Sequence, residues 1–236
     1  MKLIISNEIR TKFPDLRIGI VVAENIFNSE YKDGLKDYSS TIFKEFAHKF
    51  NSEKDLSEVK NISAWQNIYR SFGVNPRKKC PTAEALLARV IKTGFVPCIN
   101  PAVDSYLIAE TLHNLPIGGY DLNKIDGDII LRFSPGGESF RGIGSQDAEN
   151  TAPGEVIYSD YSRILTRRWN YRDCEYSKIG KATTSLALFA EGPVSEIKDV
   201  EIRETILEIS SNLGKYCAAT TKELFLDKTL DEIEIL

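Results

Sequence analysis

The chain has 236 residues, of which 42% are hydrophobic and 27% are charged, a composition typical of a folded protein with one large or two small domains. No apolar run approaches the roughly 20 residues that span a bilayer, and the apolar stretch near the start is too short for a secretory signal, so we expect a cytoplasmic protein without a membrane partner. The formal net charge of -4 argues against indiscriminate coating of nucleic acid, and we expect no DNA partner, but a local basic face could still hold a folded RNA.

The first 60 residues are predicted to form an α/β portion. Two runs rich in β-branched and apolar residues, Lys2 to Ser6 and Leu16 to Ala23, predict buried strands that begin one sheet. Apolar and aromatic residues then recur at helical spacing over residues 32–50, which predicts an amphipathic helix with its aromatic stripe in the core.

Two more helices are predicted before the middle of the chain. The apolar stripe from Ile62 to Phe72 marks the first, and Gly73 ends it because glycine is favoured just past a helix C-terminus. Val74 to Cys80 (VNPRKKC) is predicted to be a basic loop, after which Thr82 opens a helix that ends at Gly94.

Asn100 and Pro101 form a clear helix start. The asparagine side chain can accept a hydrogen bond at the N-cap, and proline lacks an N–H at a position where that donor would be unpaired. The residues that follow leave only a narrow polar strip of Asp104, Ser105 and Thr111, so we expect a core helix that other elements cover on most sides.

A glycine pair and a hairpin are predicted after Pro116, where this helix must have ended. Gly118-Gly119 supplies freedom at positive φ, which predicts a sharp turn or the close approach of another group, and this turn is the first candidate site. Asp128 to Ser134 is predicted as a strand, Pro135 to Gly137 as its turn and Glu138 to Arg141 as the returning strand.

The remainder of the chain is predicted to contain short strands followed by one helix. The strands are expected near Val156–Tyr158, Arg163–Arg168 and Ala182–Ala190. An apolar stripe from Ile202 to Cys217 predicts the last helix, Leu224–Leu226 an edge strand, and Asp227–Leu236 a frayed acidic tail.

Common enzyme motifs are absent from this sequence. It has no phosphate-binding P-loop, no dinucleotide-binding glycine fingerprint, no serine-hydrolase elbow and no zinc-protease motif. The four cysteines lack a C-x-x-C spacing and only two histidines occur, so we predict no metal site, no cofactor and no disulfide framework. His113 could act as a base, but at the end of a helix it is more often a C-terminal cap.

Basic residues gather in two groups, one before and one after the central stretch. The candidates for RNA contact are Arg77, Lys78 and Lys79 in the first group and Arg167, Arg168 and Arg172 in the second. The run RRWNYR (residues 167–172) interleaves guanidinium groups with two aromatic rings and an amide, which are the groups that contact phosphates and unpaired bases. A solvated strand face would show the same pattern, so the pattern alone leaves both interpretations open.

An ordered set of motifs between Gly73 and about Gly192 resembles the editing module of the phenylalanyl-tRNA synthetase β subunit, and more closely the small free-standing proteins built from that module alone. The motifs are VNPRKKCPTAEALLARVIK, INPAVD, LPIGGYDL, GDIILR, GESF, PGEVIYSD and RRWNYRD. The resemblance implies an α+β fold with a β-sandwich-like core of mixed sheets flanked by helices. We expect one domain over residues 1–236, with the module-like core at 61–192 between the α/β portion (1–60) and a C-terminal helix and tail (193–236).

In the synthetase this module hydrolyses tRNA that carries the wrong amino acid, tyrosine. The present chain has Gly118 where the synthetase has a histidine and Leu107 where it has an asparagine, and Asp173 and Glu175 match its tyrosine-recognising segment only roughly. Tyrosine specificity is therefore not carried over. The ATP-binding domain of the synthetase has no counterpart here, so we expect no ligase activity from this chain alone.

The resemblance implies an RNA-binding protein of translation quality control, whose partner is the aminoacyl end of a tRNA or an amino-acid-like ligand. Hydrolysis of a mischarged tRNA in trans would need only a positioned water and backbone N–H groups, and the alternative is a non-catalytic protein that binds a small molecule or a partner. The candidates to orient the water are Asp104, Glu138 and Glu155. The candidates to bind substrate are Asn100, Gly118, Gly119, Tyr120 and Asn170.

Overall fold

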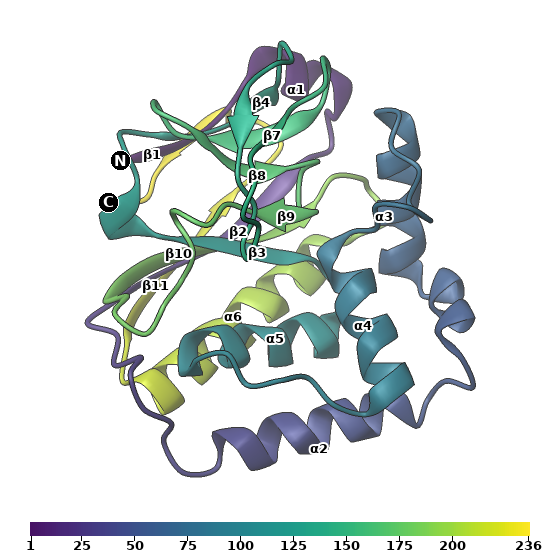
Figure 1. The fold of residues 1–236 in the computed structure, drawn as a ribbon, viewed down its shortest axis with the longest axis vertical. Helices are drawn as coiled ribbons and strands as arrows, with labels where there is room; N and C mark the ends of the chain where they lie inside the picture. Colours follow the sequence, from purple (N-terminus) through teal and green to yellow (C-terminus); the bar gives the residue numbers. More distant parts are fainter.

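Two β-sheets pack against each other at the centre of the protein, and helices cover one side (Figure 1). The structure is a computed structural model that describes residues 1–236. The first sheet is antiparallel, in the order β11 (Thr220–Leu226), β2 (Arg17–Glu24), β10 (Ser185–Gly192) and β3 (Ile117–Asp121). The second sheet is mixed, in the order β12 (Glu232–Glu234), β1 (Lys2–Ile5), β4 (Ile129–Phe133), β7 (Val156–Ser159), β8 (Ile164–Arg167) and β9 (Arg172–Asp173).

Aromatic side chains join the two sheets. The ring of Tyr158 on β7 lies 6.2 Å from that of Tyr120 on β3 and 5.9 Å from that of Phe189 on β10, measured between centroids. All three rings are buried, and rings at such separations attract each other in addition to the gain from burying their apolar area. The predicted α+β fold, with a β-sandwich-like core of mixed sheets flanked by helices, is confirmed.

The long helices lie on the outer side of the four-stranded sheet. α6 (Asp199–Cys217) packs directly on this sheet, α5 (Pro101–His113) packs beside α6, and α2 (Leu35–Ala47) lies beyond α5 (Figure 1). Contact between α6 and β2 is so close that a Cβ at Gly19 would lie 2.7 Å from Ile202 Cγ2. Glycine at this position therefore lets the last helix cover the sheet.

Helix α5 begins as the sequence predicts. The Oδ1 of Asn100 accepts the N–H of Val103 at 3.0 Å, and Pro101 is the first helical residue. The polar strip is itself covered, since none of Asp104, Ser105 and Thr111 is more than 6% exposed. Core helix α5 is therefore enclosed on almost every side.

The remaining helices are α1 (Asn7–Lys12), η1 (Glu53–Glu58), α3 (Lys60–Ser71), α4 (Thr82–Thr93) and η2 (Leu122–Lys124). The predicted helix ends are confirmed by the left-handed glycines Gly73 and Gly94, with φ of 82° and 63°. A cluster of eight buried apolar residues joins α2, η1, α3 and α4, apart from the main core of 48, and the half-buried Leu107 contacts both clusters. None of these helices combines the length and hydrophobicity that crossing a membrane requires.

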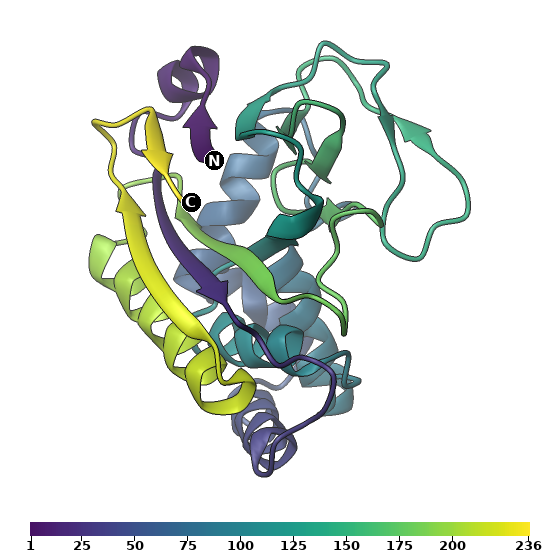
Figure 2. The same ribbon diagram turned by 90° about the vertical axis from the view of Figure 1, so that its left-hand side faces the viewer.

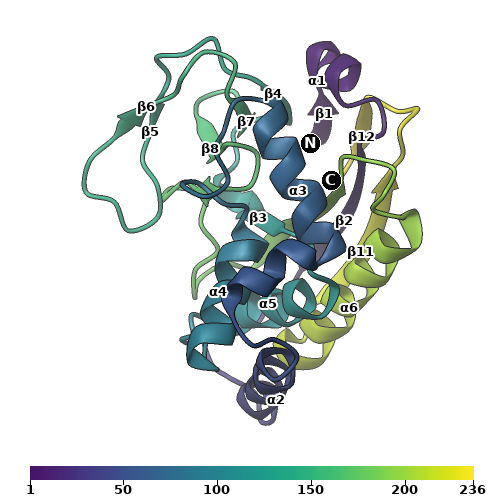
Figure 3. The same ribbon diagram turned by 90° about the vertical axis from the view of Figure 1, so that its right-hand side faces the viewer.

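Three predictions of strand arrangement are wrong. β1 and β2 are strands as predicted, but they belong to different sheets. Residues 128–141 do not form a hairpin, because β4 pairs with β7 and β5 (Ser139–Phe140) pairs with β6 (Glu149–Asn150) in an excursion that projects from the sheets (Figure 3). The acidic tail is not frayed, because β12 pairs with β1 and brings the two termini side by side (Figure 2).

Candidate ligand-binding cavity

A cavity of about 200 Å³ opens beside the turn that joins β8 to β9. Its wall contains the rings that join the two sheets, Tyr120, Tyr158 and Phe189, together with Trp169. Ile117, Gly118, Ile143 and Tyr171 also line it, and its other polar and charged lining residues are Thr82, Thr166, Asn170, Arg172, Asp173 and Glu191. An apolar aromatic wall with a few polar groups is the usual composition of a small-molecule site.

The glycine pair lies within β3 and not in a turn. Both glycines pair with β10 and neither has a positive φ, so the predicted sharp turn is wrong. The predicted close approach does occur at Gly119, where a Cβ would lie 2.4 Å from the carbonyl oxygen of Ala187. At Gly118, in contrast, a Cβ would have a single neighbour within 4 Å, Asp173 Oδ1 at 3.9 Å. The missing side chain of Gly118 therefore leaves space in the cavity.

The turn after β8 has an unusual backbone. Arg168 and Trp169 both adopt left-handed angles, with φ of 48° and 69°, a region that non-glycine residues seldom occupy. Trp169 is fully buried, and its ring lies 4.7 Å from that of Phe13 and 5.3 Å from that of Trp65, between centroids. This packing holds the turn in its strained form and directs the next residue, Asn170, to the cavity.

Glu191, on β10, is a buried carboxylate of the cavity wall with only 3% exposure. Its Oε1 accepts hydrogen bonds from the Tyr158 hydroxyl and, at 2.8 Å, from Trp169 Nε1, while neither of these donors bonds to Oε2. Burial raises the pKa of Glu191 to about 7, against the lowering effect of Tyr158, Trp169 and Asn170.

Asn170 is 6% exposed and is only partly satisfied by the protein. Its Oδ1 accepts the Tyr69 hydroxyl at 2.6 Å. Its Nδ2 lies near enough to Glu191 to lower that pKa, but it makes no hydrogen bond. A buried amide donor without an acceptor is rare in folded proteins, and it marks a polar position at which a ligand atom can bind.

Asp173 is the second carboxylate of the cavity. Its Oδ1 accepts the Thr166 hydroxyl at 2.6 Å, and that hydroxyl lies 2.6 Å from the hydroxyl of Tyr120. Loss of water around the carboxyl group raises the pKa of Asp173 to about 6, and the Thr166 hydrogen bond lowers it. No basic side chain stabilises the charge of Asp173 or of Glu191.

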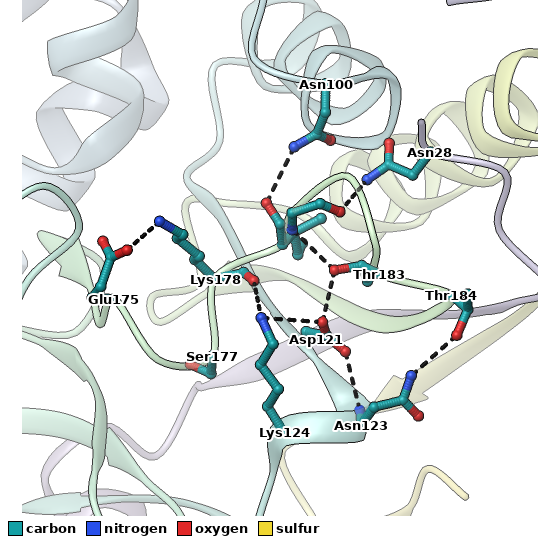
Figure 4. Close-up of polar contacts among 12 residues, drawn as sticks. Asn28, Asn100, Asp121, Asn123, Lys124, Glu175, Ser177, Lys178, Thr183 and Thr184 are labelled. Carbon is teal, nitrogen blue, oxygen red and sulfur yellow. Dashed lines mark hydrogen bonds and ion pairs between the residues drawn. The ribbon is translucent and has the colours of Figure 1, made fainter. Parts of the chain in front are cut away.

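A second cavity, of about 330 Å³, adjoins the first, since Asp173 and Ile143 line both. The loop of residues 174–184 forms one side of it, and Figure 4 shows the side chains that hold this loop. Asn100 Nδ2 donates to the carbonyl of Ile179 at 3.1 Å, and Asn28 Nδ2 donates to the next carbonyl at 2.8 Å.

Asp121, at the end of β3, anchors the same loop from the other side (Figure 4). Its Oδ2 accepts the Thr183 hydroxyl at 2.7 Å and lies 3.4 Å from Lys124 Nζ, which donates to the carbonyl of Lys178 at 3.2 Å. The loop is thus fixed by side chains from three separate segments. Its lysines, Lys178 and Lys181, line the second cavity.

The outer edge of β3 presents an N–H group to the second cavity. The N–H groups of Ile117 and Asp121 point away from β10, to Glu110 Oε1 at 3.4 Å and to the carbonyl of Ser177 at 2.9 Å. Since alternate residues of a strand direct their N–H groups to the same side, the N–H of Gly119 points the same way, and Gly119 lines this cavity.

The two predicted basic groups meet at Tyr171, which lines the first cavity. Lys79 Nζ lies 5.0 Å from the centroid of the Tyr171 ring, and the guanidinium carbon of Arg168 lies 5.4 Å from it. The N–H of Thr82 donates to the carbonyl of Asn170 at 3.2 Å, which ties the start of α4 to the turn. The exposed cations nearby in sequence are Arg77, Lys78 and Arg172.

All five residues predicted to bind substrate line the two cavities. Gly118, Tyr120 and Asn170 line the first, whereas Asn100 and Gly119 line the second. The side chain of Asn100 makes one hydrogen bond to the helix cap and one to the loop, so it holds this wall in place.

The three carboxylates predicted to orient a water lie outside both cavities and have structural partners. Glu155 accepts two hydrogen bonds from Arg167, at 2.7 and 2.8 Å, and Glu138 accepts two from Arg132, at 2.6 and 3.1 Å. Asp104 accepts the Tyr31 hydroxyl at 2.7 Å and a backbone N–H at 3.0 Å. The structure does not bring these three carboxylates to the site.

Two members of the RRWNYR run are placed differently from the prediction. Arg167 is 3% exposed, because Glu155 and Glu149 neutralise it inside the protein, so it cannot reach an RNA backbone. Trp169 is enclosed in the core and offers no ring to a base. Of this run, Arg168, Tyr171 and Arg172 remain at least partly exposed.

Glu191 and the carboxylate Glu110 on α5 were not predicted as functional residues. Glu110 is fully buried, its Oε2 has no hydrogen-bond partner, and burial raises its pKa well above the ordinary value. The available signal was a single acid in an otherwise apolar segment, LALFAEG for Glu191 and SYLIAETL for Glu110.

The family match covers the part of the chain that contains the residues lining both cavities. The sequence profile of the B3/4 domain matches residues 64–226. Among solved structures, the chain is similar to an N-terminal fragment of the phenylalanyl-tRNA synthetase β subunit from Pyrococcus horikoshii, with a TM-score of 0.48 and 11% identity. The match covers 94% of this chain and 53% of the fragment, so the chain spans about half the length of that fragment. No curated protein matches the chain.

Proposed function

The chain belongs to the B3/4 domain family, to which the editing module of the phenylalanyl-tRNA synthetase β subunit belongs, and from this premise we propose that it binds the aminoacyl end of a tRNA. The amino acid occupies the two adjoining cavities, and the basic residues beside Tyr171 contact the tRNA backbone. The bound ester is then hydrolysed in trans, in the cytoplasm, as a step of translation quality control.

The convergence of the two basic groups on the cavity is the observation that supports RNA binding most directly. Lys79 and Arg168 come from segments almost 90 positions apart in sequence, yet both flank the same ring, Tyr171. Arg172 lines the cavity itself. A cationic surface next to an aromatic ring suits a phosphate backbone and an unstacked terminal base.

The size and lining of the cavities fit a single amino acid better than a large metabolite. Aromatic and aliphatic groups in the first cavity would pack on a side chain, while Asp173, Glu191 and Asn170 offer polar contacts. Gly118 leaves additional space beside Asp173, so the pocket differs in shape from one that carries a histidine there.

Hydrolysis would rely on positioning and on backbone donors. The N–H of Gly119, at the edge of β3, is placed to donate to an ester oxygen as negative charge develops on it, and Asp173 lines the same cavity. Such a donor needs no covalent nucleophile, which agrees with the absence of a catalytic triad among the lining residues.

The test is a panel of aminoacylated tRNAs, with binding and release of free amino acid measured for each. We expect one or a few members to bind and to be hydrolysed faster than without protein. Tight binding without release would favour the non-catalytic binding protein. No binding of any tRNA at low salt would reject the RNA proposal.

A further inference from the structure

We infer that the first cavity recognises the protonated amine of its ligand through the carboxylates of Asp173 and Glu191. This inference rests on the proposed function, because it names the group of the amino-acid ligand that these two residues hold. It also sets the orientation of that ligand, with the ammonium group toward the sheets and the ester toward Gly119 at the edge of β3.

The hydrogen bonds of the two carboxylates leave one oxygen of each for a ligand. Thr166 donates only to Oδ1 of Asp173, and both donors to Glu191, Tyr158 and Trp169, use Oε1. No Lys or Arg pairs with either carboxylate, although both line the same cavity. Two acidic groups thus face one small space from which water is largely removed.

Glu155, a buried carboxylate outside the cavity, has the cationic partner that Asp173 and Glu191 lack. Glu155 is 5% exposed, and it is compensated by two hydrogen bonds from Arg167, at 2.7 and 2.8 Å. Buried charges are normally paired in this way, because an unpaired charge in an apolar environment is strongly unfavourable. In the cavity, Arg172 pairs with neither Asp173 nor Glu191, and a ligand amine would supply the cation that these carboxylates lack.

Asn170, which lies beside Glu191, gives a second indication of the same ligand. It is 6% exposed, it lines the cavity, and its Nδ2 has no acceptor in the protein. A carbonyl oxygen would satisfy this donor. An aminoacyl group carries an ammonium and a carbonyl on adjacent carbon atoms. Its ammonium can pair with the carboxylates while its carbonyl accepts the hydrogen bond from Asn170 Nδ2.

The pKa values of the two carboxylates agree with this assignment. Burial raises the pKa of Asp173 to about 6 and that of Glu191 to about 7, because no cation stabilises either charge. An ammonium group beside them would favour the ionised form and lower both pKa values. Binding of an amine is therefore expected to release protons to the buffer near neutral pH.

The direct test is calorimetric titration of the full chain with twenty L-amino-acid amides and with their Nα-acetyl forms. Amides avoid the hydrolysis that esters would undergo. At least one amide should bind, and loss of its α-ammonium by acetylation should weaken binding roughly 10- to 100-fold, the range for hydrogen bonds to charged groups. Equal affinity for free and acetylated forms, or no binding by any amide, would overturn the inference.

Two variants keep the shape of the site and remove its charge, Asp173→Asn and Glu191→Gln. Each retains an oxygen for its protein donors, and each should weaken binding of the amide by roughly tenfold or more. Glu196→Gln is the matched control, because Glu196 is an exposed carboxylate five positions from Glu191 that lines neither cavity. Melting temperatures show whether the variants are folded, and unchanged affinity in folded Asp173→Asn and Glu191→Gln would contradict the inference.

A comparison of aminoacyl-tRNA with Nα-acetyl-aminoacyl-tRNA separates this inference from the proposed function. Equal binding of the two tRNAs would overturn the ammonium contact and leave tRNA binding standing. Binding of an amide without binding of any tRNA would support the ammonium contact and reject tRNA binding.

Discussion

Gly118 and Gly119 are adjacent residues with opposite tolerance of a side chain. A valine at Gly118 would extend into the cavity beside Asp173 without meeting the backbone, so Gly118→Val should keep the melting temperature and reduce binding of amino-acid amides and tRNA at least tenfold. At Gly119 a Cβ would overlap the Ala187 carbonyl, so Gly119→Ala should destabilise the fold by about 1–3 kcal/mol. Thermal melts and binding titrations of both variants check this contrast. Wild-type affinity in Gly118→Val would show that its open space is not part of the site.

The carboxyl group of Glu191 should make stability depend on pH near neutrality. Its pKa is about 7 in the folded protein and near 4.5 in the unfolded chain, so the folded state binds the proton more tightly. The resulting stabilisation is complete below pH 4.5 and is lost as the pH rises through 7, and Asp173 acts in the same direction up to about pH 6.

Glu191→Gln isolates this effect. The variant should unfold with a free energy roughly 1–3 kcal/mol higher than the wild type at pH 8 and with little difference at pH 5, since glutamine cannot ionise. Urea denaturation at both pH values measures the change. If the free energy of unfolding changes by the same amount between pH 5 and pH 8 in the wild type and in Glu191→Gln, the raised pKa of Glu191 is contradicted.

At the scale of elements, Asn100 links helix α5 to the loop of residues 174–184. Its Oδ1 caps the helix and its Nδ2 holds the carbonyl of Ile179. Asn100→Asp keeps the cap acceptor but places an oxygen against that carbonyl, whereas Asn100→Ala removes both contacts and should cost about 0.5–2 kcal/mol for the cap alone. Amide hydrogen exchange should show faster exchange in the loop of both variants. Unchanged exchange there would mean that Asn28 and Asp121 hold the loop without Asn100.

Elements whose ends are determined by neighbouring residues in the sequence could be predicted from the sequence. The cap at Asn100 and the glycines after α3 and α4 act within one turn of their helices, so residue order alone reveals them. Strand pairing is set by distant partners, and nothing near Ile129–Phe133 indicates that β4 pairs with Val156–Ser159 and not with the next strand. The same reason explains why the pairing of β12 with β1 was missed.

The sequence indicated which segments contain the candidate site, but it assigned several of their residues the wrong role. Part of the RRWNYR run lines the first cavity, and Asn170, a predicted substrate-binding residue, is among its lining residues. Arg167 and Trp169 were misjudged because a charged or aromatic residue gives no local sign of the partner that buries it, here Glu155 and the ring of Trp65. Glu191 was missed because a single acid in an apolar strand carries no motif.

For the whole molecule, the net charge of -4 means that RNA would be attracted by a particular face and not by the protein as a whole. The cations available on that face come from the loop before α4 and from the β8–β9 turn, which the Thr82–Asn170 hydrogen bond keeps together. RNA binding is therefore expected to depend on both segments, although they are distant in the sequence.

The salt dependence of tRNA affinity tests this arrangement. Each phosphate that a Lys or Arg neutralises releases condensed counterions, so the logarithm of affinity should fall with the logarithm of salt by about 0.7 to 0.9 per contact. The double variants Lys78→Gln/Lys79→Gln and Arg168→Gln/Arg172→Gln should each reduce this slope by roughly one to two units. Arg168 lies 3.8 Å from Glu155, so the second pair should lower stability slightly more than the first.

Lys222→Gln on the edge strand β11 is the control, since it removes a cation away from both cavities. Fluorescence titrations at several salt concentrations give the slopes, and melting temperatures confirm folding. If the control reduces the slope as much as either double variant, the attraction comes from overall charge, and the cavity face has no special role in RNA binding. If only the two double variants reduce it, the cations that meet at Tyr171 form the RNA-binding surface, and the aminoacyl end of the tRNA is brought to the cavity beside them.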